Sequence, residues 1–238
     1  MTTKSAFTIG LLAMLLAVPA FGASINKSIK IGAGEEADGA TSVNGSISVG
    51  ADAVVTGNLK TVNGTIRVDD GAQIGKASTV NGGLRISENV RAENLSTVNG
   101  SVKVGEGVVV DGDVSAVNGR ITLERGVTVS EGVGNVNGQM EFSGATVGGD
   151  VETVNGDIEL ADQSVVRGDI IVEKPSGWSW GKEKRRKPRI IIGPGSRVEG
   201  EIHVEREVEL YISDSADVGG VSGEMTMDDA ERFSGERP

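Results

Sequence analysis

The chain contains few of the residue types that most often take part in catalysis or metal binding. Its 238 residues include no cysteine, one histidine (His203), five prolines, four phenylalanines, two tryptophans and one tyrosine. The lack of cysteine excludes disulfide bonds, a thiol nucleophile and a thiolate metal site, and a single histidine disfavours a histidine-based zinc site. We therefore expect no cofactor and no metal site.

Positive charge is also scarce, whereas glycine is abundant. The 23 Lys and Arg residues face 34 Asp and Glu residues, which leaves a formal net charge of −11. This balance argues against a nucleic-acid-binding protein. The 36 glycines are roughly twice the ordinary share, but they lack the every-third spacing of collagen.

The only marked apolar run lies at the N-terminus. Residues 9–18 (IGLLAMLLAV) follow a short basic start and precede small residues. This order predicts a signal peptide over residues 1–22, with Ala20 and Gly22 as the −3 and −1 residues. The run is too short to span a membrane. We therefore expect an exported protein, in the periplasm or on the surface of a bacterium, or secreted from it.

The tripeptide Val-Asn-Gly occurs seven times at intervals of 18 or 19 residues, which predicts stacked structural units. Its asparagines are Asn44, Asn63, Asn81, Asn99, Asn118, Asn137 and Asn155. For these residues we expect a structural ladder, in which the glycine turns a left-handed corner and the amides hydrogen bond up the column. A ligand-binding strip is the alternative.

Within each unit, apolar residues recur in pairs two residues apart. In the first unit the pairs are Ile47/Val49 and Ala53/Val55, and Val43 and Leu59 complete the apolar set. A pair at this spacing is typical of a short strand with one buried face, and polar or glycine turns separate the pairs. The sequence predicts an all-β fold: a single-stranded parallel β-helix with three-sided coils.

The residue before each valine is often threonine, and an outward threonine ladder is typical of ice binding. Three of the seven units depart from threonine, which disfavours that function. The departures are Ser42, Ala116 and Asn135.

The apolar pattern outlasts the tripeptide, so we expect about nine or ten coils in all. The predicted parts are an N-terminal cap and partial coil (23–40), seven Val-Asn-Gly coils (41–172), an inserted loop (173–189), C-terminal coils (190–222) and an acidic tail or cap (223–238).

The inserted loop concentrates tryptophan and positive charge. This combination predicts binding to an anionic glycan, lipopolysaccharide or a membrane surface. A solvated hairpin is the alternative. The candidate binding residues are Trp178, Trp180, Lys182, Lys184, Arg185, Arg186, Lys187 and Arg189.

The repeated TVNG-x-[IV] units resemble the adhesin-type β-helix domain family of bacterial envelope proteins. The segments VVVDGDV, SVVRGDI and SRVEGEI are similar to the bactofilin (polymer-forming cytoskeletal) family. The resemblance and the usual crossover preference imply a right-handed helix. They also imply an exported structural or adhesin-like protein without a catalytic site. The alternatives are a bactofilin-like scaffold that self-associates, and a polysaccharide-active enzyme on a β-helix.

Overall fold

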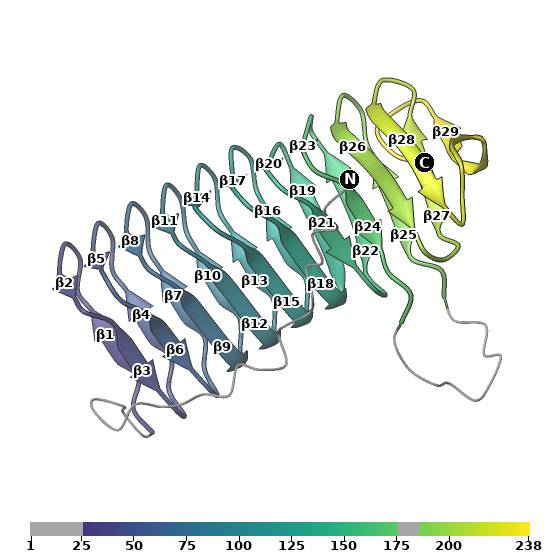
Figure 1. The fold of residues 1–238 in the computed structure, drawn as a ribbon. Helices are drawn as coiled ribbons and strands as arrows, with labels where there is room; N and C mark the ends of the chain where they lie inside the picture. The colour runs from purple at the N-terminus through teal and green to yellow at the C-terminus, as the bar shows by residue number, and fades with distance from the viewer. Residues whose placement is uncertain (1–25, 176–185) are drawn as a thin grey trace, which may run out of the picture.

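The computed structural model describes residues 26–175 and 186–238. In them the chain winds into a parallel β-helix of about ten stacked coils, in which three strand-bearing faces surround a narrow core (Figure 1). The predicted fold class is therefore confirmed. The predicted signal peptide, residues 1–22, lies outside the described residues.

The first face is an 11-stranded parallel sheet to which each coil contributes one strand, and β29 of the C-terminal tail adds the last. We number the coils by these strands. They are β1 (Ile29–Ile31), β4 (Ile47–Val49), β7 (Ile66–Val68), β10 (Leu84–Ile86), β13 (Val102–Val104), β16 (Ile121–Leu123), β19 (Gln139–Ser143), β22 (Asp157–Ala161), β25 (Arg189–Ile192), β27 (Glu209–Ser213) and β29 (Glu231–Phe233).

An 18-stranded sheet forms the other two faces. The second face holds β2 (Glu36–Ala37), β5 (Val54–Val55), β8 (Gln73–Ile74), β11 (Arg91–Ala92), β14 (Val109–Val110), β17 (Thr128–Val129), β20 (Thr146–Val147) and β23 (Val165–Val166). The third holds β3 (Ala40–Ser42), β6 (Leu59–Thr61), β9 (Ala77–Asn81), β12 (Leu95–Asn99), β15 (Val114–Asn118), β18 (Val133–Asn137), β21 (Val151–Thr153) and β24 (Ile170–Val172). In the last coils β26 (Arg197–Val204) and β28 (Asp217–Gly223) run across both faces.

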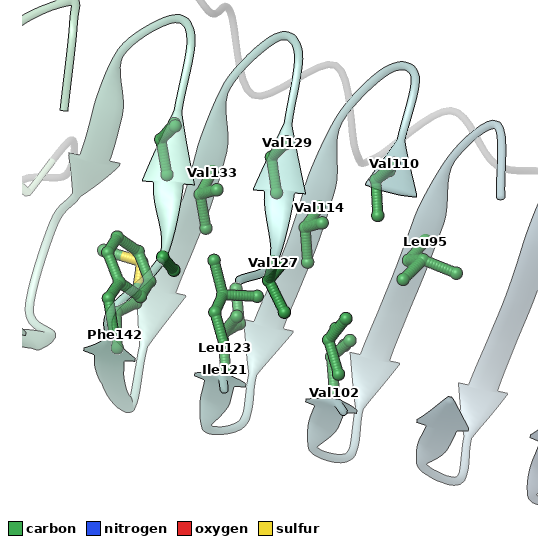
Figure 2. Packing of buried hydrophobic residues seen from close by; sticks show 14 of the residues in the cluster. Leu95, Val102, Val110, Val114, Ile121, Leu123, Val127, Val129, Val133 and Phe142 are labelled. Carbon is green, nitrogen blue, oxygen red and sulfur yellow. The ribbon is translucent and has the colours of Figure 1, made fainter. Parts of the chain in front are cut away.

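Apolar side chains from all three faces fill the interior. The pairs Ile47/Val49 and Ala53/Val55, together with Leu59, are at most 2% exposed, as their spacing predicted. Figure 2 shows how Val102, Val110 and Val114, from three different strands, point into the same narrow space. Because the coils stack in register, each side chain packs on its counterparts one coil above and below.

The valine of Val-Asn-Gly, in contrast, faces outward, and the prediction that Val43 lies inside is wrong. Val43 and Val98 are only partly buried, whereas the preceding Ser42 and Thr97 are each 1% exposed. Side chains alternate along a strand, so Leu95 and Thr97 both point inward and Val98 cannot. Val154, 7% exposed, is the buried exception in this column.

The glycine of Val-Asn-Gly is needed for space rather than for a left-handed turn, which corrects a second prediction. Of the seven, only Gly138 has a positive φ (129°). A Cβ on Gly82 would lie 1.9 Å from the Gly64 carbonyl oxygen, and one on Gly119 would lie 1.8 Å from that of Gly100. The coils therefore approach too closely at this corner for any side chain.

The left-handed residues instead lie at the corner that follows each strand of the first sheet. Asp52 (φ 56°), Gly71 (70°), Asn89 (55°) and Gly107 (68°) occupy this place in successive coils.

The C-terminal residues close one end of the helix. Met225, Met227 and Ala230 pack against the core, and β29 pairs with β27, which leaves Phe233 9% exposed. Among the described residues, no helix has the length and apolar character to cross a membrane.

Candidate binding surfaces

The asparagines of the repeat form a continuous ladder along one corner. Each donates a hydrogen bond from Nδ2 to Oδ1 of the asparagine one coil earlier, at 2.7–3.0 Å. All seven side chains are exposed. Because each amide binds its neighbours, the arrangement matches the structural role expected of this column.

Two residues that sequence analysis missed extend the ladder. Asn26 accepts from Asn44 at the N-terminal end (2.7 Å), and Arg206 Nη1 donates to Asn155 Oδ1 at the other end (3.1 Å). Asn26 could have been found, because SINKSIKI (24–31) aligns with SVNGSISV (42–49). Arg206 carries no such signal, since no repeat motif surrounds it.

The threonine column lies inside the helix and donates to backbone. The hydroxyls of Thr61, Thr79 and Thr97 bond the carbonyl oxygens of Gly45, Gly64 and Gly82 in the preceding coil, at 2.8–2.9 Å. These threonines are at most 3% exposed. A buried column offers ice no surface, so the structure excludes ice binding through these residues.

The described part of the predicted basic loop is neutralised within the chain. Arg186 pairs with Asp157 (2.7 Å), Lys187 with Glu207 (2.6 Å) and Arg189 with Glu209 (3.0 Å). The Arg189 guanidinium also lies 5.6 Å from the centre of the Tyr211 ring. An anionic partner would have to compete with these carboxylates. The other candidates, Trp178, Trp180, Lys182, Lys184 and Arg185, lie outside the described residues.

Carboxylates gather where the second and third faces meet. Burial, followed by repulsion from Glu173, Asp150 and Asp113, raises the pKa of Glu152 to about 7. Repulsion from Asp113, together with a hydrogen bond between the two carboxyls, raises the pKa of Glu131. Glu152 can therefore hold a proton near neutral pH. Among the described residues, however, no three acidic or histidine side chains are placed to hold a metal ion.

A shallow depression lies on the first sheet over coils six to eight. Glu141, Phe142, Glu159 and Asp162 line it, and Arg237 of the C-terminal tail reaches into it and pairs with Glu159 (3.0 Å). The outward surface of the first sheet is therefore acidic in this half and partly covered by the chain's own tail.

The other half of the first sheet carries a basic column that sequence analysis missed. Lys30, Ser48, Arg67, Arg85 and Lys103 lie side by side in register on β1, β4, β7, β10 and β13. Their positions are 18 or 19 residues apart in the chain, so no local charge run marked them. We call these residues the basic column.

The fold defines the class of protein to which this chain belongs, the parallel β-solenoids. Comparisons with family models, with curated proteins and with solved structures each found no match. The resemblance to adhesin-type and bactofilin domains is therefore still a prediction.

Proposed function

We propose that the protein is an exported, non-enzymatic, adhesin-like β-helix protein of the bacterial cell envelope that binds an anionic surface or glycan. The signal-peptide pattern at residues 1–22 supports export. The repeat resemblance supports an adhesin-like role.

One observation carries the non-enzymatic part of the proposal: the coils are minimal. In residues 26–175 and 186–238 the strands follow one another through short turns, and a longer segment of the chain connects β24 to β25. Enzymes on β-helices generally build a cleft from long loops that bring carboxylates together. The hydrogen-bonded carboxyl pair Asp113 and Glu131 lies on an open corner where Glu131 is exposed.

A bactofilin-like polymer would need both ends of the helix free for stacking. Met225, Met227 and Phe233 cover the C-terminal end. This cover opposes the end-to-end pairing of open strand edges, so we favour a monomer or small oligomer over a filament.

The test combines localisation with a binding panel. Cell fractionation should place the protein in the periplasm, on the surface or in the medium. The chain from residue 23 onward should co-sediment with lipopolysaccharide, peptidoglycan or an acidic glycan, but not with neutral dextran. A cytoplasmic location would overturn the proposal, and so would binding to no material. Filaments in negative-stain images would instead support the bactofilin-like alternative.

A further inference from the structure

The basic column sets like charges side by side, and three of its four cations lack a carboxylate partner among the described residues. Arg67, Arg85 and Lys103 are direct partners on neighbouring parallel strands, about 4.8 Å apart. Like charges in such positions destabilise a sheet. Lys103 pairs with Glu124 (2.8 Å), but no carboxylate of the described residues lies within 4.0 Å of the charged groups of Lys30, Arg67 or Arg85.

The columns on either side of these cations consist almost entirely of small residues. Two residues before each outward position stand Ser28, Ser46, Thr65, Gly83 and Ser101, and two residues after it stand Gly32, Gly50, Asp69, Ser87 and Gly105. All of these residues except the buried Gly105 are exposed or partly buried. Asp69 is the one acidic member. The result is an open strip of cations and hydroxyl groups, along which β1 to β13 lie side by side (Figure 1).

The strip has a defined end. From coil six onward the same outward row continues as Thr122, Glu141 and Glu159, and its sign reverses. The five coils that carry the strip span about 19 Å between the first and last strand.

We propose that this strip binds a linear anionic polysaccharide whose chain runs along the helix axis. Its carboxylate or sulfate groups pair with Lys30, Arg67 and Arg85, the cations that have no carboxylate partner among the described residues. Arginine forks pair well with such groups, and hydroxyl side chains suit the neighbouring sugar hydroxyls. Neighbouring strands lie about 4.8 Å apart, which is close to the length of one pyranose residue, so a segment of about four sugars would cover the strip. This inference rests on the proposed function and assigns its anionic glycan to this surface.

The strip fits an anionic partner better than the described cations of the inserted loop do. Arg186, Lys187 and Arg189 already have carboxylate partners at 2.6–3.0 Å. A ligand at the loop must break those pairs. A ligand at Arg67 and Arg85 instead relieves an existing repulsion.

The experiment uses the chain from residue 23 onward, with polygalacturonate as the carboxylated probe, dextran sulfate as the sulfated probe and dextran as the neutral probe. Affinity is measured by titration calorimetry at low salt. The test variant is Arg67→Gln/Arg85→Gln, and the matched control is Arg186→Gln/Lys187→Gln, which removes the same charge. We expect about tenfold weaker binding for the test variant, less than twofold for the control, and weakening with added salt. A thermal melt of each variant checks that it folds.

The strip is overturned by unchanged binding in the test variant, by equal losses in the two variants, or by no binding of either polyanion to the parent chain. Tighter binding to DNA or to anionic vesicles than to both glycans also overturns it, because it indicates another class of partner. An envelope location with glycan binding that depends only on Arg186 and Lys187 overturns the strip but leaves the proposed function standing.

Discussion

The inner and outer sides of the third face present opposite chemistry from neighbouring residues. Thr97 lies inside and bonds a backbone carbonyl, while Val98, the next residue, lies outside between the valines of adjoining coils. A polar residue is stable inside because the corner leaves a carbonyl oxygen in need of a donor. Strict repetition of an apolar residue therefore does not show that it is buried.

The largest expected effect comes from placing a charged side chain on the inner side of the third face. Leu95 is fully buried, so Leu95→Asp places an unpaired carboxylate in the dry core. We expect it to destabilise the fold by more than about 4 kcal/mol. Urea unfolding followed by circular dichroism measures the effect. Leu95→Val, which keeps an apolar side chain, is the control, and equal stability of the two variants would contradict the inward assignment.

The corner glycine of Val-Asn-Gly, where neighbouring coils approach most closely, can be tested by adding a methyl group. Gly100→Ala would set a Cβ 2.0 Å from the Gly82 carbonyl oxygen, so the backbone must shift. We expect a loss of about 2–3 kcal/mol in the free energy of unfolding. Gly32→Ala is the matched control, because its nearest neighbour is the flexible side chain of Glu35. A harmless Gly100→Ala would show that the corner has room to spare.

Glu152 faces outward but is buried, so the pH dependence of stability tests the outer side of the third face. The pKa of Glu152 is raised to about 7 in the folded protein, so the folded state binds the proton of this carboxyl more tightly than the unfolded state does. Its stabilising contribution is complete below the unfolded pKa near 4.5 and is lost as pH rises towards 7.

Glu152→Gln, which is neutral at every pH, should therefore be more stable than the parent chain at pH 8. We expect a difference on the order of 1–2 kcal/mol after allowing for solvent screening, and almost none at pH 4.5. Urea unfolding at both pH values measures it. Glu106→Gln, at an exposed residue, serves as the control substitution.

The smallest effect is expected on the outer side. Val98→Asp leaves its carboxylate in contact with solvent, so we expect a loss of less than about 1 kcal/mol. Thermal melts should therefore give a much higher melting temperature for Val98→Asp than for Leu95→Asp, although the two residues are only three apart in the sequence. A Val98→Asp melt as low as that of Leu95→Asp would place the valine inside.

The fold could be predicted because the Val-Asn-Gly repeat shows the length of one coil directly in the sequence. The spacing of Ile47/Val49 and Ala53/Val55 revealed the buried side of each strand. The direction of Val43 was predicted wrongly because its repetition as an apolar residue was taken as a sign of burial, whereas alternation from Ala40 and Ser42 turns it outward.

The binding surfaces were harder to predict, because their residues are distant in the sequence and become neighbours only through the strand register. Arg186 and Lys187 are adjacent in the sequence, so their basic run was recognised. Their carboxylate partners Asp157 and Glu207 lie on other coils, so the ion pairs were not predicted. The basic column is the reverse case, since its residues are scattered along the chain and meet only in the stacked sheet.

The asparagine ladder gives the helix an electrical direction. Every Nδ2–H points towards the N-terminal coil and every Oδ1 towards the C-terminal one, so the amide dipoles add along the axis. Hydrogen bonds in such a row polarise one another. The negative end of the row is the Oδ1 atom of Asn155, where the guanidinium of Arg206 lies. That cation is matched to the polarity of the row, as a basic side chain is at the C-terminus of an α-helix.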